Sequence, residues 1–472
     1  MTNNRLILIA LAFMTALATL AQERAKYVFY FIGDGMGVNQ VNGAETYLGA
    51  LEGRIGTAPL TFASFPQVGL VNTQSATNGV TDSAAGGTAL ATGHKTKNSA
   101  LGLLADLTTP VQSIAVKARE AGAAVGVATN VSVDHATPGA FYAHVPNRNM
   151  YHQIGRDLIA AEFDFYAGSD FRQPEDKADS LGSLFKQCAD AGYTVVRGYK
   201  DYLKKRKKAQ RMILLQSEKP SNGDRTCLPY AMDRRAGELT LTDITRAGIS
   251  FLTARPETAE KGFFLMMEGG KVDYACHAND AAAAFKEVID LDNAVRVAYE
   301  FYQQHPEETL IVITADHETG GLVLGRGAYE LHTEALRHQK MSAEEYSRHL
   351  SRLCEKAGKK LSWELVENDL KENWGFWQAV KLNDHQTKRL HKAYDALAEG
   401  HDTDAKNLYA SLNGLADAAR RTMAECAHIG WQSGGHSNGY VPVFAVGAGA
   451  EKFGGRIDNT LIPQKIVEAA GW

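Results

Sequence analysis

The stretch Lys26-Tyr27-Val28-Phe29-Tyr30-Phe31-Ile32-Gly33-Asp34-Gly35-Met36-Gly37 decides the fold. Residues 27–32 form an unbroken apolar run, which is typical of a central strand covered on both faces of a parallel sheet. The glycines that follow allow a sharp turn, and this turn projects Asp34 from the carboxyl end of the strand. Ligands bind at that edge in open α/β sheets. A turn aspartate without a ligand is the alternative.

Similar apolar runs predict further strands, with helical patterns between them. The expected strands are 123–128, 193–197, 212–215, 263–267, 310–314 and 442–446. Strands that alternate with helices predict an α/β fold, here a three-layer α/β/α sandwich around a large, mostly parallel sheet. Residues 329–427 are charged, poor in strands and rich in helix formers. We expect them to form a helical insertion over one end of the sheet, within a single catalytic domain spanning residues 22–472.

The first residues resemble an export signal. Arg5 precedes an apolar run over residues 6–20, and small residues surround Ala21, after which we expect cleavage. Residues 1–21 are therefore predicted to be a signal peptide, and the mature protein to be periplasmic or extracellular. The run is short for a membrane span, and no cysteine follows the cut. We expect no membrane anchor.

Composition excludes some classes of protein. The 472 residues carry a net charge of −4, which argues against a dedicated nucleic-acid partner despite the basic run at 204–208. The five cysteines are odd in number and form no compact framework, so we expect one disulfide or none. A Cys188–Cys227 bridge is the candidate pairing.

Thr81-Asp82-Ser83-Ala84-Ala85 introduces a run of small residues that can form a closely packed helix. If the helix begins at Ser83, the hydroxyl lies beside unpaired backbone N–H groups and the positive end of the helix dipole, a suitable place to attack an anion. A simple helix cap by serine or aspartate is the alternative.

Metal-ligand residue types recur at the ends of the expected strands. Glu268 closes the strand 263–267, and a helix that begins near Lys271 would place Asp273 and His277 on one face. Further candidates follow or precede other strands: Asp316, His317 and His436. Their shared place at strand ends makes one common metal centre the favoured interpretation.

Together these motifs resemble the alkaline phosphatase family in order and spacing, from about residue 26 to residue 470. The matching positions are Gly33-Asp34-Gly35, Thr81 to Ala85, His135 and Thr137, Arg148, Glu268, Asp273 and His277, Thr314 to His317, and Gly435-His436. The resemblance implies two zinc ions and one magnesium ion. The first zinc would be held by Asp273, His277 and His436, the second by Asp34, Asp316 and His317, and the magnesium by Glu268, Thr137 and Asp34.

The resemblance also implies a mechanism for phosphate monoesters. Ser83, deprotonated on the second zinc, would attack phosphorus and form a phosphoserine, and hydroxide from the first zinc would then release phosphate. Arg148 would bind two phosphate oxygens and be oriented by Asp82. Family members are often dimeric, so we expect a homodimer, although no interface can be read from the sequence.

Two positions depart from the best-known bacterial pattern. His135 replaces an aspartate of the magnesium shell, which leaves the identity of the third ion open. Tyr274 replaces a cationic residue that contacts phosphate, which predicts weaker phosphate retention. A phosphodiesterase or sulfatase on the same fold is the alternative function, and a non-catalytic phosphate- or metal-binding protein is the alternative class.

Overall fold

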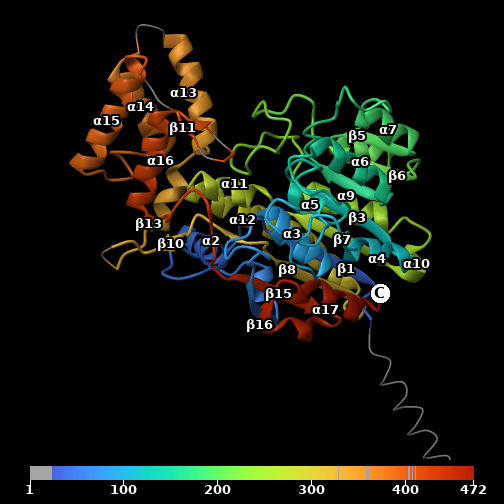
Figure 1. Cartoon of the computed structure of the whole chain (residues 1–472). Helices are drawn as coiled ribbons and strands as arrows, with labels where there is room; N and C mark the ends of the chain where they lie inside the picture. Colours follow the sequence, from blue (N-terminus) through green and yellow to red (C-terminus); the bar gives the residue numbers. More distant parts are fainter. Residues whose placement is uncertain (1–23, 328, 358–360, 402–403, 407, 410) are drawn as a thin grey trace, which may run out of the picture.

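The computed structural model describes residues 24–327, 329–357, 361–401, 404–406, 408–409 and 411–472 (Figure 1). The expected signal peptide, residues 1–21, lies outside the described residues and stays a prediction. Among the helices of the described ranges, none has the length and apolar character needed to cross a membrane. Cys188 and Cys227 are both free thiols, so the candidate bridge between them is not formed.

Ten strands form one large sheet, in the order β16-β2-β15-β8-β1-β7-β3-β4-β6-β5. Across the sheet their bounds are β16 Gly455–Asp458, β2 Gln67–Asn72, β15 Val441–Gly447, β8 Thr309–Thr314, β1 Tyr27–Ile32, β7 Phe263–Glu268, β3 Ala124–Thr129, β4 Phe165–Gly168, β6 Arg211–Leu215 and β5 Tyr193–Arg197. All pairings are parallel except those that β15 makes with β2 and β8. The predicted, mostly parallel sheet is confirmed.

Strand β1 lies in the middle of the sheet, as its unbroken apolar sequence predicts. Every residue of β1 and of its neighbours β7 and β8 is buried. Ile32 pairs with Glu268 of β7 and with Thr314 of β8. The three strands therefore end at the same level, and the residues that follow them emerge at one edge of the sheet.

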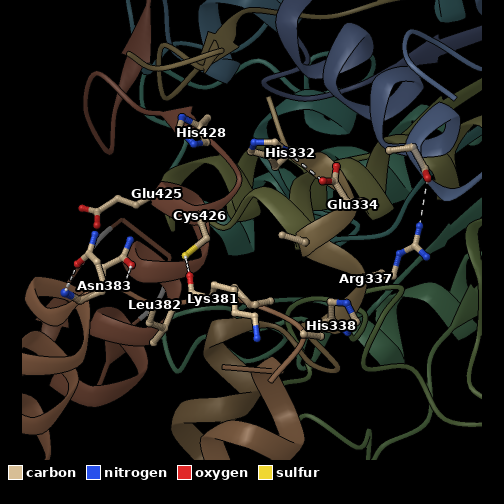
Figure 2. Close-up of a pocket in the computed structure, with 15 residues that line it drawn as sticks. His332, Glu334, Arg337, His338, Lys381, Leu382, Asn383, Glu425, Cys426 and His428 are labelled. Atoms are coloured by element: carbon tan, nitrogen blue, oxygen red, sulfur yellow. Dashed lines mark hydrogen bonds and ion pairs between the residues drawn. The ribbon is translucent and has the colours of Figure 1, made fainter. Parts of the chain in front are cut away.

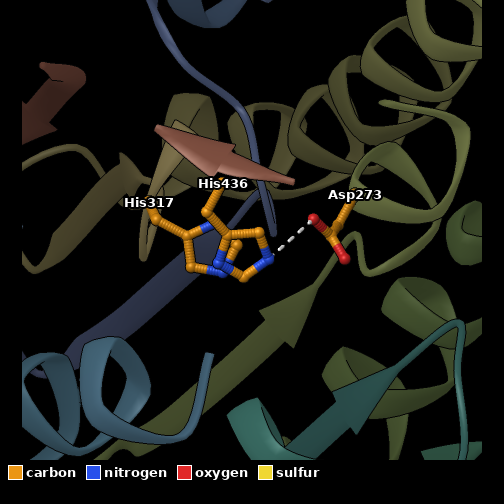
Figure 3. A group of neighbouring side chains, drawn as sticks. All are labelled: Asp273, His317 and His436. Carbon is orange, nitrogen blue, oxygen red and sulfur yellow. Dashed lines mark ion pairs between the residues drawn. The ribbon is translucent and has the colours of Figure 1, made fainter. Parts of the chain in front are cut away.

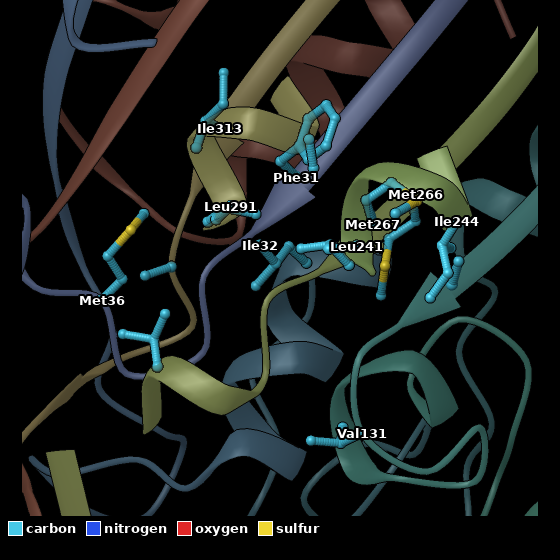
Figure 4. Close-up of a cluster of buried hydrophobic side chains, with 14 of the residues drawn as sticks. Phe31, Ile32, Met36, Val131, Leu241, Ile244, Met266, Met267, Leu291 and Ile313 are labelled. Atoms are coloured by element: carbon cyan, nitrogen blue, oxygen red, sulfur yellow. The ribbon is translucent and has the colours of Figure 1, made fainter. Parts of the chain in front are cut away.

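Helices cover both faces of the sheet, which gives the predicted three layers (Figure 1). One face carries α2 (Val38–Leu51), α9 (Leu241–Leu252) and α12 (Ala281–Gln304), and the other carries α3 (Ser83–Thr92), α4 (Ile114–Glu120), α5 (Ala136–Gly139) and α17 (Leu461–Ala470). Phe31 of β1, Met267 of β7 and Leu291 of α12 belong to the core that joins the sheet to the first group of helices (Figure 4). Burying both faces of the sheet is what makes a parallel architecture stable.

The remaining elements connect the layers or lie outside them. Their bounds are η1 Phe62–Ser64, α6 Tyr151–Ala161, α7 Leu184–Asp190, α8 Tyr199–Lys205, α10 Thr258–Lys261, α11 Lys271–His277, β9 Glu318–Thr319, β10 Val323–Leu324, β13 Ile429–Gly430, β14 His436–Ser437 and η4 Ala450–Phe453. Strand β10 pairs with β13 and β9 pairs with β14, both antiparallel.

The segment 329–427 carries its own group of helices, which stand beside the body of the molecule (Figure 1). They are η2 Thr333–His338, α13 Ala343–Ala357, α14 Trp363–Trp374, α15 Asp384–Ala398 and α16 Gly414–Cys426, with the short pair β11 Ala405–Lys406 and β12 Ser411–Leu412. Tyr346 and Trp374 are buried among these helices with ring centroids 5.3 Å apart. Strands β10 and β13 join the chain entering this group to the chain leaving it.

Candidate active site

The predicted site residues gather at the edge where the parallel strands end. Asp34 follows β1, Glu268 ends β7, and Asp316 follows β8. His436 instead precedes β15, because β15 runs against its neighbours and presents its amino end at the same edge. The reversed strand explains why this histidine comes before its strand while the carboxylates come at the ends of theirs.

The start of α3 combines the two interpretations given above: Asp82 caps the helix, and Ser83 faces the candidate metal ligands. Asp82 is the N-cap of α3, and its Oδ1 accepts a hydrogen bond from the Ala85 N–H at 3.0 Å. Ser83 is the first helical residue and is fully buried, with its Oγ 3.2 Å from His317 Nε2. Because aspartate caps the helix, the serine hydroxyl remains available to the cluster of metal-ligand side chains.

The small residues after Ser83 are required by the close approach of α3 to the loop after β8. A Cβ at Gly86 would lie 2.8 Å from the carbonyl oxygen of Asp316. Every residue of α3 is buried. The helix can bring the serine to the site only because its neighbours lack bulk.

One group of candidate ligands consists of Asp273, His317 and His436 (Figure 3). His277 lies beside this group, with its Nε2 3.1 Å from His436 Nε2. His436 Nε2 lies 3.7 Å from Asp273 Oδ1, and His277 Nε2 lies 3.2 Å from Asp273 Oδ2. The other ring nitrogen of His436 lies 2.9 Å from the carbonyl oxygen of Thr81, and that of His277 lies 2.5 Å from the carbonyl oxygen of Gly434. Carbonyl oxygens only accept hydrogen bonds, so both Nε2 atoms are left free to bind a metal.

A second group consists of Asp34, Asp316 and His317. His317 Nε2 lies 3.3 Å from Asp34 Oδ1 and 3.4 Å from Asp316 Oδ2. His317 therefore lies between the two groups, and its Nε2 also faces the Ser83 hydroxyl.

A third group consists of Asp34, His135 and Glu268, all buried. His135 Nδ1 lies 3.8 Å from Glu268 Oε1, and the Thr129 hydroxyl donates a short hydrogen bond to the other carboxylate oxygen. Burial lowers the pKa of His135, which favours the neutral imidazole. Thr137 on α5 is fully buried.

Four carboxylates, those of Asp34, Glu268, Asp273 and Asp316, are completely buried at this edge. Within the described chain, both oxygens of Asp34 and one oxygen of each of the other three have no hydrogen-bond partner, and neither has the hydroxyl of Thr137. Burial, followed by the charge of Asp316, raises the pKa of Asp34 well above its ordinary value. Uncompensated buried carboxylates are strongly unfavourable, so the donor set fits bound cations.

Arg148 approaches the site from the side of Asp82 and His135. Its Nη1 lies 3.5 Å from Asp82 Oδ2, and its Nη2 lies 3.1 Å from His135 Nε2. Asp82 Oδ2 also accepts a hydrogen bond from the Ser99 N–H at 3.0 Å. The carboxylate thus has a fixed orientation from which it can position the guanidinium group.

Two residues of the site were missed from the sequence. Tyr409, from the segment 329–427, accepts a 3.3 Å hydrogen bond from Arg148 Nη2, and its ring stacks on that of Tyr274 with centroids 3.9 Å apart. Thr319 donates a hydrogen bond to Asp273 Oδ1 and lies 3.2 Å from His317 Nδ1. A tyrosine in a charged helical segment carries no sequence signal of a role in the site. Thr319 could have been noticed, because it lies two residues after the candidate pair Asp316-His317.

Some other side chains of metal-ligand type have structural partners instead. Glu318 accepts hydrogen bonds from the Gln40 side chain at 2.7 Å and from the Gly321 N–H at 3.1 Å, so it braces the loop after β8. Cys276 is fully buried, as expected for a packed thiol. His144 Nε2 lies 3.2 Å from the carbonyl oxygen of Val111.

Gly35 occupies a position that only glycine can fill, and this gives a first prediction. Its φ is +74°, and an added Cβ would lie 2.8 Å from Thr319 Oγ1 and 2.9 Å from Asp273 Oδ1. Gly53 also has a φ of +74° but has no atom within 4 Å of an added Cβ. We expect Gly35→Ala to cost about 1–3 kcal/mol more than Gly53→Ala and to reduce the metal content of the protein.

Thermal unfolding and metal analysis of the two purified variants measure this difference. Equal losses in Tm and in metal content would show that backbone strain alone matters and that the crowding at Asp273 does not.

Comparisons with known proteins agree with this arrangement. A family model described as "Alkaline phosphatase" matches residues 25–164 and 163–472. The chain is 32% identical to alkaline phosphatase 4 of Bacillus subtilis over 81% of this chain and 74% of that protein. It is 30% identical to alkaline phosphatase 3 of the same organism over 95% and 89%.

Solved structures show the same fold. A cold-active alkaline phosphatase from a Shewanella species superposes with a TM-score of 0.77 at 27% identity, covering 94% of this chain and 99% of that one. The alkaline phosphatase of Thermus thermophilus superposes with a TM-score of 0.75 at 28% identity, covering 95% and 92%. The chain therefore belongs to the alkaline phosphatase family, whose enzymes hydrolyse phosphate monoesters.

Proposed function

We propose that this protein hydrolyses phosphate monoesters through a phosphoserine on Ser83, at a centre that binds two zinc ions and one magnesium ion. The observation that carries the proposal is the buried Ser83 hydroxyl, 3.2 Å from His317 Nε2 at the start of a helix. The positive end of α3 favours an anionic phosphoryl group at this place.

The residues of the chain have distinct roles in the proposed reaction. Ser83 Oγ gives up its proton and attacks phosphorus. The bond from Oγ to phosphorus forms as the bond from phosphorus to the ester oxygen breaks, and that oxygen takes up a proton from water and leaves as the alcohol. Arg148 binds two equatorial phosphate oxygens, and Asp82, 3.5 Å from Arg148 Nη1, fixes the orientation of the guanidinium group. Water then cleaves the phosphoserine, which returns the hydroxyl and releases inorganic phosphate.

The donor types favour particular ions. Asp273, His277 and His436 would hold the first zinc, and Asp34, Asp316 and His317 the second, since zinc prefers imidazole and carboxylate. Glu268, Asp34 and Thr137 would hold magnesium, which prefers oxygen. His135 adds a nitrogen there, so this site can also accept a transition ion. Bound ions would lower the pKa of the attacking oxygen and stabilise the charge that develops on the leaving oxygen.

A dianionic monoester suits the planar fork of Arg148 better than a diester or a sulfate, which carry less charge. Turnover of p-nitrophenyl phosphate, bis-p-nitrophenyl phosphate and p-nitrophenyl sulfate, each with and without EDTA, separates the three activities. We expect the monoester to be preferred and its turnover to depend on metal. A preference for the diester or the sulfate would favour the alternative function, and no turnover with any substrate would favour a binding protein.

Tyr409→Phe is expected to lower kcat/KM about tenfold, because the variant loses a hydrogen bond to the charged Arg148, an interaction that contributes about 1.5 kcal/mol. Steady-state kinetics with p-nitrophenyl phosphate measures this change. Tyr394→Phe is the matched control: this tyrosine lies on α15 and donates a hydrogen bond to the Leu361 carbonyl at 3.2 Å. Equal kinetics for the two variants would remove Tyr409 from the set of positioning residues.

Tyr274 places an aromatic ring at the position where the best-known bacterial members of the family carry a cationic residue that contacts phosphate. We expect Tyr274→Lys to tighten inhibition by inorganic phosphate about tenfold, because a charge in a partly dehydrated site interacts strongly with a dianion. Tyr274→Leu, which loses the stack on Tyr409 without gaining charge, should not tighten it. Inhibition constants measured side by side decide the matter, and a lysine variant no tighter than wild type contradicts the expectation.

We further propose that the chain is exported to the periplasm or the medium after cleavage behind Ala21, and that it assembles as a homodimer. The apolar run at 6–20 supports the first proposal, and the frequent dimerisation of family members supports the second. Amino-terminal sequencing of the exported protein and light scattering of the purified protein test them separately.

A further inference from the structure

A further group of side chains of metal-ligand type lies outside the active site, where the chain enters and leaves the helical segment 329–427. Glu330, His332 and His428 each offer one donor atom, and these atoms lie within 4.8 Å of one another. His332 and His428 lie side by side at one end of a surface pocket of about 830 Å³, with Glu334 next to His332 (Figure 2). None of these residues belongs to the three active-site groups.

The backbone holds the two chain segments in fixed register. The N–H groups of Gly325 and Arg326 donate to the carbonyl oxygen of His428 at 3.0 and 2.7 Å, and the N–H of His332 donates to the carbonyl oxygen of Ala427 at 3.1 Å. His428 has a φ of +55°, a conformation rarely adopted by residues other than glycine. The backbone thus accepts some strain in placing this side chain opposite His332.

The hydrogen bonds of the two imidazoles direct the same nitrogen of each ring toward Glu330. His428 Nδ1 lies 3.2 Å from the carbonyl oxygen of Arg326, and His332 Nδ1 lies 3.2 Å from Glu334 Oε1. Both of these partners accept hydrogen bonds and can hold a proton on Nδ1 of each ring. His332 Nε2 faces a further acceptor, Glu330 Oε2, so an ion at this place would bind the tautomer of His332 whose proton lies on Nδ1. A histidine that donates its second N–H to a carboxylate or a carbonyl is the usual arrangement in metal sites.

The distances between donors suit a small divalent ion. His332 Nε2 lies 3.3 Å from Glu330 Oε2, and His428 Nε2 lies 3.7 Å from the same oxygen. Two ligands at about 2.0–2.2 Å from a tetrahedral zinc ion are separated by about 3.4 Å. Both histidine nitrogens therefore lie within a few tenths of an ångström of this separation from Glu330 Oε2, and all three donor atoms lie within 4.8 Å of one another.

We propose that Glu330, His332 and His428 bind a divalent transition metal ion, zinc being the best match, which clamps the base of the helical segment 329–427. Three protein ligands leave a fourth position for water, and Glu334 orients His332 from outside the ligand set. The ion would bind only when both ends of the segment are in place, so its binding free energy stabilises their pairing.

The first test counts zinc. Wild type and the double variant His332→Ala, His428→Ala are brought to equilibrium with the same buffered free zinc, and bound zinc per chain is measured by elemental analysis. We expect the double variant to bind one ion fewer, with p-nitrophenyl phosphate turnover unchanged. Since the difference is taken between two proteins that share the active site, it does not depend on how many ions the active site holds.

His391→Ala is the matched control, because His391 lies in the same segment and pairs with Asp395 at 3.4 Å. Its side chain is 48% exposed, similar to the 46% of His332. It should bind as much zinc as wild type. Equal zinc in wild type and the double variant would overturn the proposal.

A second test uses milder substitutions and a local readout. We expect Glu330→Gln to weaken the zinc site at least tenfold, and Glu334→Gln about tenfold through His332. In wild type, zinc should slow hydrogen exchange at the amides of Gly325, Arg326 and His332, which hold the two segments together. Slowing of the same size in the double variant, or none in wild type, would contradict the clamp.

Discussion

Ser83→Ala is expected to reduce kcat for p-nitrophenyl phosphate by at least about a thousandfold while leaving the fold intact. The variant keeps the proposed ligands and Arg148 but loses the side chain proposed to form a bond with phosphorus, and loss of a nucleophile typically costs this much or more. Acid quenching of the wild-type reaction followed by mass spectrometry should show one added phosphoryl group on the peptide that contains Ser83.

Ser169→Ala is the matched control for this experiment. Ser169 is also fully buried and follows β4 directly, at the carboxyl edge of the sheet. Its removal should change kcat by no more than about twofold. Undiminished turnover by Ser83→Ala would falsify the phosphoserine mechanism, and the peptide analysis would then show no phosphoryl group at this residue.

Removal of metal is expected to abolish turnover and to lower the Tm of the protein. Without cations, four buried carboxylates lie together at the active-site edge, and each ion that binds only the folded state adds its binding free energy to stability. Dialysis against a chelator, followed by addition of zinc and magnesium together or singly, measures both effects. Activity that survives chelation would mean that the centre does not work through bound ions.

The metal-free protein should also show a characteristic dependence of stability on pH. Burial and neighbouring carboxylates raise the pKa values of Asp34 and Asp316 well above the ordinary value of an aspartate. The folded state therefore holds protons that the unfolded chain has released. For each such group, stability falls by up to about 1.4 kcal/mol per pH unit as pH rises toward its folded pKa, and is regained as pH falls.

We therefore expect the Tm of the metal-free protein to fall as pH rises over the range in which these carboxylates release their protons, whereas the metal-loaded protein should lack this trend because cations replace the protons. The comparison is restricted to pH values at which His135 and His317 are neutral, since burial lowers the pKa values of both and acid would destabilise the fold through them. Identical pH profiles with and without metal would contradict the assignment of these carboxylates as ligands.

The strands that lie in the centre of the sheet could be predicted from sequence because burial on both faces leaves an unbroken apolar run. Strands β2, β4 and β16 were missed. Val68 and Leu70 of β2 are exposed while Val71 is buried, so β2 alternates, and β4 and β16 have only four residues each. Short or half-exposed strands give a weak pattern, and their place in the sheet is set by tertiary pairing.

The candidate ligands were predictable for a geometric reason, since ends of parallel strands converge on one edge. The direction of β15 was not predictable, because no local pattern distinguishes a parallel from an antiparallel strand when both faces are buried. The approach of Tyr409 to Arg148 was not predictable either, because it depends on how a helical segment far along the chain folds back on the site.

The place of β15 has a consequence for how the enzyme matures. This strand comes near the end of the chain, yet it lies between β2 and β8, and the residues just before it bring His436 to Asp273. Until it inserts, β2 and β16 have no connection to the rest of the sheet, and closing so long a loop slows folding. We therefore expect a growing chain, which carries Ser83 and most of the proposed ligands early, to stay inactive until almost the last residues have been made.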